Sequence, residues 1–208
     1  MVQVSFVCAP VAAVASLSPP SQSARPGAAL SYTLSLKNND LPSCRSTTFA
    51  LTPAVPAGWT GTVTPGSLNL LPGEAGSAIL AVTSPANAAS TGYTVGVDSA
   101  DGVELTHNSS ASAVHLVDGI PPAAPSNLRP AVRRRRIQLS WTASTDNMGV
   151  AGYSVWRNNT LLATTTSTST SYQDLAVTVG ATYTYFVTAR DSAGNISAPS
   201  STVTVKAK

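Results

Sequence analysis

The stretch Leu30-Ser31-Tyr32-Thr33-Leu34-Ser35-Leu36 indicates the fold class, because apolar and hydroxyl side chains alternate along its length. Successive side chains of a β-strand point to opposite faces, so the pattern predicts a strand with one buried and one solvated face. Asn38-Asn39-Asp40 follows and predicts a turn. By the same criteria we expect further strands in the first half of the chain, at residues 11–17, 48–52, 60–64, 67–71, 78–83, 93–98 and 111–117.

A second run of alternation begins after a proline-rich segment. Pro121, Pro122 and Pro125 cannot continue a hydrogen-bonded ladder and favour an extended spacer. Beyond it, apolar residues again recur at alternate positions: Ile137, Leu139 and Trp141; Tyr153 and Val155; Tyr183, Tyr185, Val187 and Ala189; Val203 and Val205. We therefore predict an all-β chain of two tandem β-sandwiches, with domains at residues 1–118 and 126–208 and a linker at residues 119–125.

The composition favours a secreted module over an enzyme. The 208 residues are 43% hydrophobic and only 10% charged, and 53 of them are Ser or Thr. Such a surface is wetted by hydroxyl groups rather than by the Glu- and Lys-rich faces of helical bundles. Two His, two Cys and nine carboxylates leave little for an active site, and no apolar run approaches the roughly 20 residues of a transmembrane helix. We expect no catalytic residue, no cofactor, no metal and no membrane span.

The positive charge is concentrated in one place. Arg133-Arg134-Arg135-Arg136 supplies four cations to a chain whose formal net charge is +3. One interpretation is a solvated turn that prevents pairing of sheet edges. A second is docking onto an anionic polysaccharide, another anionic cell-surface ligand or another domain. We expect no nucleic acid as partner, because neither interleaved aromatic residues nor a recognition helix accompany the arginines.

The second half of the chain resembles a bacterial fibronectin type III domain. The resemblance covers nearly all of residues 121–206, and it rests on Pro122-Ala-Ala-Pro125, Leu139-Ser-Trp141, Asp146-Asn147, Gly149-Val-Ala-Gly152-Tyr153-Ser-Val155-Trp156, Tyr183-Thr-Tyr185-Phe-Val187 and Asp191-Ser-Ala-Gly194-Asn195. It implies that Trp141 is the main aromatic residue of the core. It also implies that Tyr183 is a tyrosine corner whose hydroxyl returns to the backbone. The arginine run departs from the family, which has a polar turn between its first two strands.

The first half resembles, more loosely, the immunoglobulin-like domain that accompanies bacterial α-galactosidases and many secreted peptidases. The matching stretches are Leu17-Ser-Pro19, Pro26-Gly27, Ser31-Tyr32-Thr-Leu34, Asn38-Asn39-Asp40, Val55-Pro56-Ala-Gly58-Trp59 and Leu70-Leu71-Pro72-Gly73. The resemblance implies a tail attached to the catalytic domain of a secreted hydrolase.

Cys8 and Cys44 are the two cysteines of the chain. An even pair in a chain of extracellular composition predicts a disulfide, which in the loop-entropy model is worth about 3–4 kcal/mol for a loop of about 36 residues. Free thiols are the alternative. A metal site would need further ligands at close spacing.

The two histidines make a weak case for zinc. His107 and His115 are eight residues apart, with Asp101 and Glu104 nearby, and the sequence contains no HExxH motif. We expect His107 on a turn and His115 at a solvent-facing position of a strand.

Four further residues offer oxygen atoms to a hard cation. Asp146, Asn147, Asp191 and Asn195 lie in loops of the second domain and could supply ligands for calcium. Asx residues in turns also hydrogen-bond their own backbone, and this simpler interpretation is preferred.

Two aromatic residues are out of phase with the buried positions. Trp156 alternates against Tyr153 and Val155, and Phe186 lies between Tyr185 and Val187 on a strand that pairs with that of Trp156 in this fold. Both side chains should face outward and could form a flat platform for a sugar ring or an extended peptide. The alternative is that the two rings pack on each other.

Together these observations predict a non-catalytic accessory tail of a secreted bacterial peptidase or glycosidase. It would space the enzyme or dock it onto a polysaccharide, a protein polymer or a cell surface, with the catalytic domain in cis. The alternative is a structural or adhesive stalk. Because the opening residues, Met1 to Phe6, lack a signal-peptide pattern, we expect a fragment of a longer secreted chain.

Overall fold

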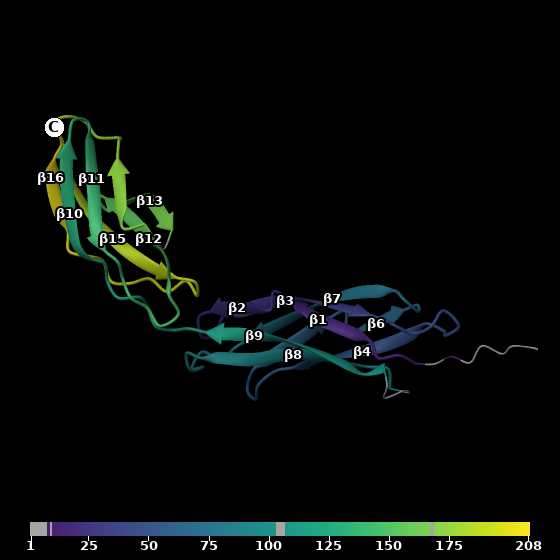
Figure 1. Ribbon diagram of the computed structural model, residues 1–208. Coiled ribbons are helices and arrows are strands. Elements are labelled where there is room, and N and C mark those ends of the chain that lie inside the picture. Colours follow the sequence, from purple (N-terminus) through teal and green to yellow (C-terminus); the bar gives the residue numbers. More distant parts are fainter. Residues whose placement is uncertain (1–7, 9, 103–106, 167–168) are drawn as a thin grey trace, which may run out of the picture. The chain divides into compact units, whose positions relative to one another are not determined.

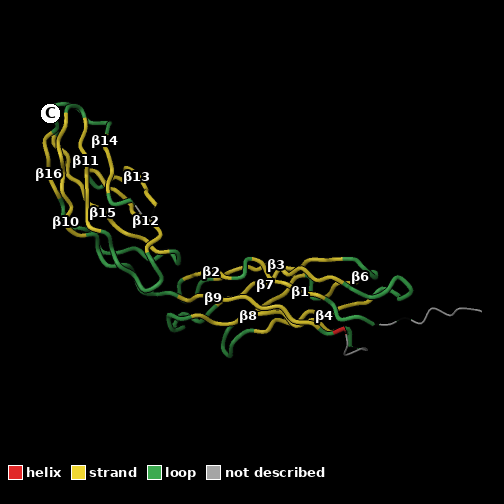
Figure 2. Tube along the Cα trace, in the orientation of Figure 1, coloured by secondary structure: helices red, strands yellow, loops and turns green. Residues whose placement is uncertain are grey.

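The computed structural model describes residues 8, 10–102, 107–166 and 169–208, and these form sixteen β-strands (Figure 1). Strands and their connecting loops make up nearly all of the trace (Figure 2). The chain divides into two compact units, Met1–Val117 and Asp118–Lys208. Met1 to Val7 and Glu104 lie outside the described residues, so the expectations placed on them have no structural counterpart. No helix in the described ranges is long and apolar enough to cross a membrane.

The first unit is a sandwich of two sheets. One has the strand order β1-β3-β7-β5 and the other β2-β9-β8-β4-β6. Neighbouring strands are antiparallel except β2 and β9, which run parallel. The bounds are β1 Val14–Ser18, β2 Ser21–Ala24, β3 Ala29–Lys37, β4 Thr47–Ala54, β5 Thr60–Thr64, β6 Ser67–Leu70, β7 Ala75–Thr83, β8 Gly92–Ala100 and β9 Ser109–Val117.

The alternating stretch that indicated the fold is strand β3. Tyr32, Leu34 and Leu36 are fully buried, and the hydroxyl residues between them are exposed. With Phe49 and Leu80 they form the centre of the first core. The predicted half-buried strand is confirmed, and its apolar face accounts for the packing of the two sheets.

The second unit is a smaller sandwich. Its sheets have the orders β10-β11-β14 and β13-β12-β15-β16. The bounds are β10 Ser126–Arg133, β11 Arg136–Thr142, β12 Val150–Arg157, β13 Thr160–Thr166, β14 Ser171–Asp174, β15 Thr182–Asp191 and β16 Val203–Lys206.

Aromatic residues fill the second core as expected. Trp141 is 6% exposed and packs edge-to-face on the fully buried Tyr153, with 5.4 Å between ring centroids. The Tyr183 hydroxyl accepts a hydrogen bond of 2.9 Å from the backbone N–H of Thr178, so it does return to the backbone. Tyr185 lies deeper than Tyr183 and is fully buried.

The proline-rich segment is packed rather than free. Pro122 and Pro125 are buried, and the backbone N–H of Ala123 donates to the carbonyl of Thr145 over 2.9 Å. Residues 119–125 therefore belong to the second unit, which begins at Asp118. The first unit ends at Val117, one residue before the predicted domain end at residue 118.

Candidate functional site

The two out-of-phase aromatic residues lie side by side on the face of the β12–β15 pair that points away from the core. Trp156 and Phe186 are direct cross-strand partners. Their rings are nearly parallel, at 10°, with centroids 5.6 Å apart, and both residues are half-buried. The indole N–H of Trp156 donates to the hydroxyl of Thr188 over 3.3 Å. The rings are stacked on each other, as in the alternative that the sequence left open, and each remains partly exposed.

A third apolar side chain extends this surface. Leu161 on β13 is the cross-strand partner of Trp156 and is 48% exposed, whereas the adjacent Leu162 packs against the core. Leu161, Trp156 and Phe186 thus form a row across three strands, which we call the apolar row. Sequence reasoning missed Leu161, because adjacent leucines give no sign of which one faces outward.

A shallow depression adjoins the apolar row. It has a volume of about 260 Å³ and is lined by Arg157, Asn158, Thr160, Leu161 and Leu162. Hydrogen-bonding groups therefore lie beside exposed apolar surface. A sugar has matching groups, because its hydroxyls form hydrogen bonds and its C–H faces are apolar.

The four arginines form the tip of the β10–β11 hairpin. Arg133 and Arg136 are the last cross-strand pair, and all four side chains are exposed. Arg135 adopts the left-handed conformation with φ of 57°, and its backbone N–H donates to the carbonyl of Lys208 over 2.8 Å. Lys208 is a further exposed cation that sequence reasoning did not place here.

The arginine tip and the apolar row belong to different sheets. The tip ends the β10-β11-β14 sheet, and the row crosses β13, β12 and β15 of the other. None of the ion pairs between described residues involves the tip, so its charge is not neutralised within that part of the chain.

The cysteines are joined, and they lie close to one of the histidines. Cys8 and Cys44 form a disulfide with an S–S distance of 2.10 Å. His107 lies in the same depression and is buried between two carboxylates: its Nε2 is 3.1 Å from Asp40 Oδ1, and its Nδ1 contacts Asp101 Oδ2. These contacts engage both ring nitrogens of His107, one with each carboxylate.

His115 does not face solvent, so that expectation was wrong. Its ring is fully buried and packs edge-to-face on Trp59, with 4.9 Å between centroids, and near Tyr32 at 6.3 Å. Neither ring nitrogen has a hydrogen-bond partner in the described part of the chain, and burial lowers the pKa of His115. The two histidines have different neighbours and form no common site.

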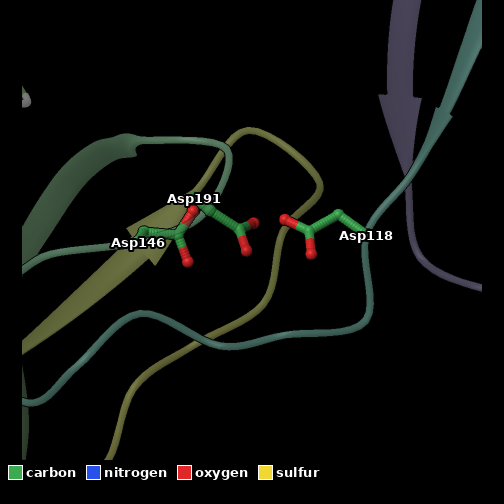
Figure 3. Close-up of side chains that lie close together, drawn as sticks. All are labelled: Asp118, Asp146 and Asp191. Atoms are coloured by element: carbon green, nitrogen blue, oxygen red, sulfur yellow. The ribbon is translucent and has the colours of Figure 1, made fainter. Parts of the chain in front are cut away.

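Three carboxylates gather in the loops of the second unit. Asp118 begins the unit, Asp146 lies in the β11–β12 loop and Asp191 ends β15, and one carboxylate oxygen of each lies within 4.8 Å of the others (Figure 3). Asn147 and Asn195 donate to this group: Asn147 Nδ2 to Asp118 Oδ1 over 3.2 Å, and Asn195 Nδ2 to Asp191 Oδ2 over 2.8 Å. The structure thus brings together the four residues that the sequence indicated as possible calcium ligands: Asp146, Asn147, Asp191 and Asn195. Asp118 lies among them and was not predicted from the sequence.

Known proteins similar to this chain are bacterial polysaccharide hydrolases. Chitinase Chi52 of Paenibacillus xylanexedens is 46% identical over 89 residues, which are 42% of this chain and 17% of the relative. Chitinase A1 of Niallia circulans is 46% identical over 86 residues, or 41% of this chain and 12% of the relative. Exoglucanase B of Cellulomonas fimi is 42% identical over 92 residues, or 44% of this chain and 8% of the relative. The chain therefore spans less than a fifth of these relatives, as an accessory module does and a catalytic domain does not.

The comparison with solved structures concerns the fold alone. Fibronectin(III)-like modules of Clostridium thermocellum CbhA superpose over 94% of both chains with a TM-score of 0.50 and 12% identity. No family model matches the sequence. The chain is a non-catalytic β-sandwich segment that contains a fibronectin type III-like module, related to accessory modules of bacterial chitinases and cellulases.

Proposed function

We propose that this chain is an extracellular accessory segment that holds a polysaccharide hydrolase on its polymer, and that the apolar row is the contact surface. The relatives support the class of ligand, since they are named as chitinases and an exoglucanase. The observation that carries the proposal is the stacked pair of Trp156 and Phe186 on the outer face of the four-stranded sheet.

The two stacked rings remain partly exposed, and this exposed part of the apolar row can contact a chain of sugars. The Thr188 hydroxyl and the parallel stacking hold the Trp156 ring in place, so little side-chain entropy is lost when a ligand binds. Aromatic rings contact the C–H faces of sugars through the dispersion and desolvation that also stabilise aromatic pairs. A few such contacts give the weak, reversible attachment that an accessory segment requires.

The arginine tip supports a second mode of attachment. Its four exposed cations, together with Lys208, suit an anionic cell-surface polymer. The two modes differ in their response to salt. Solvent-exposed charge interactions are screened over about 8–10 Å at physiological ionic strength, whereas apolar contacts are not.

A pull-down assay separates the two modes. The full chain, a four-fold Arg→Ser variant of the tip and Trp156→Ala are incubated with chitin, cellulose and heparin at low and high salt. We expect retention on chitin or cellulose that resists salt and is lost in Trp156→Ala. Retention on heparin that falls with salt and is lost in the arginine variant would instead assign attachment to the tip. Equally weak binding of all three proteins to every polymer would contradict the proposal and leave the segment a spacer.

A further inference from the structure

We propose that Asp118, Asp146 and Asp191 bind a calcium ion that stabilises the second unit. The three carboxylates come from the first residue of the unit, the β11–β12 loop and the end of β15, and they point toward one another (Figure 3). Asp118 and Asp191 are 0% and 2% exposed. No cationic side chain within the described ranges pairs with any of them.

The hydrogen bonds of the cluster leave specific oxygen atoms without partners. Asp118 Oδ1 accepts from the backbone N–H of Ile120 over 3.0 Å, and Asp146 Oδ2 accepts from Met148 over 2.8 Å. The other oxygens of these two residues, Asp118 Oδ2 and Asp146 Oδ1, are buried and have no hydrogen-bond partner among the residues that the structure describes. A buried carboxylate oxygen without a donor is strongly disfavoured, so the observed arrangement calls for a positive partner.

The local donors do not complete the cluster. Asn195 donates its backbone N–H and its Nδ2 to the two oxygens of Asp191, each over 2.8 Å, which orients that carboxylate. The Asn195 Nδ2 also donates to the backbone carbonyl of Asp118 over 2.9 Å, which ties the two acidic segments together. These bonds fix the carboxylates in place without neutralising their charge. Each carboxylate oxygen has two lone pairs, so Asp191 can still act as a ligand.

The spacing and ligand type select calcium. Ca²⁺ binds oxygen atoms at about 2.3–2.6 Å, so two ligands on opposite sides of one ion lie about 5 Å apart. One carboxylate oxygen of each aspartate lies within 4.8 Å of the other two, and this spacing is compatible with one shared ion. Ligands from three separate segments do not impose a regular octahedron, which Mg²⁺ requires and Ca²⁺ does not. The all-oxygen ligand set disfavours zinc, which prefers nitrogen and sulfur.

Calorimetry of the full chain tests the proposal. Protein stripped with EDTA is heated with and without about 10 mM CaCl₂, and the transition of the first unit is identified by its response to reduction of the Cys8–Cys44 disulfide. For a dissociation constant of about 1 mM, typical of extracellular calcium modules, we expect the second unit to melt about 5–10 °C higher with Ca²⁺. The first unit should not respond, and MgCl₂ should give a smaller shift.

Single substitutions locate the ion. Asp146→Asn, at the half-buried position, should weaken calcium binding in titration calorimetry at least about tenfold. It should abolish the calcium-dependent shift and yet leave the EDTA form as stable as the parent or more so, because one of three repelling charges is removed. Asp118→Asn should behave in the same way. Asp98→Asn, an exposed carboxylate in the first unit, is the matched control and should retain the shift.

Three results would overturn the proposal. The first is a melting temperature of the second unit that does not respond to calcium. The second is calcium binding that persists in Asp146→Asn. The third is an equal response to magnesium, which would reject the assignment of the ion. If Asp118→Asn does not fold, Asp146→Asn decides the question alone.

Discussion

Replacing Asp174 by Ala should destabilise the second unit severely. Asp174 ends β14 and is 1% exposed. Its Oδ2 accepts from Arg157 Nη1 over 2.9 Å and from the Tyr185 hydroxyl over 2.7 Å. Burial, together with the hydrogen bond to Asp174, raises the pKa of Tyr185, so its hydroxyl stays protonated and remains a donor at any physiological pH.

The expected magnitude follows from what the substitution leaves behind. Without the carboxylate, the fully buried hydroxyl of Tyr185 loses its acceptor. The Arg157 guanidinium, whose side chain is 25% exposed, loses its charged partner and keeps the carbonyl of Ala176, to which Nη1 donates over 2.8 Å. Breaking a buried pair in this way costs about 3–5 kcal/mol, and the partial exposure of Arg157 favours the lower value. At about 4–8 °C per kcal/mol, the second unit should melt roughly 12–25 °C lower.

A double-mutant cycle tests the reasoning by thermal and urea unfolding. In an Arg157→Met, Tyr185→Phe background, Asp174→Ala should cost much less, because both side chains that donate to Oδ2 are already gone. The donor to Oδ1 is the backbone N–H of Ala176, an exposed residue that water can reach in either background. The transition of the first unit should not move in any variant. The reasoning is refuted if Asp174→Ala costs less than about 1 kcal/mol, or if its cost is the same in both backgrounds.

Three further predictions follow from the structure. Intact mass should show the chain two hydrogens lighter than its reduced form, because Cys8 and Cys44 are joined. Cys44→Ser should destabilise the first unit by about 3–4 kcal/mol. Two freely titrating thiols in the native protein would exclude the disulfide. Because burial lowers the pKa of His115, the unfolded first unit binds a proton more readily than the folded one. The free energy of unfolding of this unit should therefore be constant above about pH 6.5 and should fall below it by at most about 1.4 kcal/mol per pH unit. The same slope in His115→Phe would assign the pH dependence to another group. Gly152→Ala should destabilise the second unit by more than about 2 kcal/mol, because a Cβ at that position would lie 2.2 Å from the backbone oxygen of Thr165. An unchanged urea midpoint would show that β12 and β13 can separate without cost.

The period-2 pattern predicted those strands that have one apolar face. It found β3 and β11, whose buried residues alternate regularly, and it failed for β2, whose Ser-Gln-Ser-Ala sequence has no apolar face. That strand exists because it pairs in parallel with β9. Backbone pairing of this kind leaves no trace in the side chains. Strands β13 and β14 were missed for another reason: Leu162 and Tyr172 pack against the core, but their strands show no regular alternation of apolar and polar residues.

His115 shows how residue type can mislead where periodicity is right. Ala111, Ala113 and Val117 are buried and share its phase on β9, so alternation alone places His115 in the core. Its polarity suggested the opposite face, while Val114 is 40% exposed. The aromatic rings near His115 come from Tyr32 on β3 and from Trp59, which lies just before β5, and their arrangement could not be predicted from the local sequence.

The candidate sites were predictable only where strand pairing determines them. Trp156 and Phe186 were placed together because the fold pairs β12 with β15 and both residues are out of phase with the core. The acidic cluster draws on positions 118, 146 and 191, which share no local motif. Asp118 was missed because it precedes the prolines and so was assigned to the other domain.

The measurement that tests the central claim most directly is an NMR titration of the indole N–H signals. The chain contains three tryptophans, so Trp59 and Trp141 serve as internal references for Trp156. On addition of a soluble chito- or cello-oligosaccharide to the full chain, we expect the Trp156 signal to move progressively while the signals of Trp59 and Trp141 stay in place. A Trp156 signal that does not move at saturating concentrations of either sugar would contradict the assignment of this surface to polysaccharide.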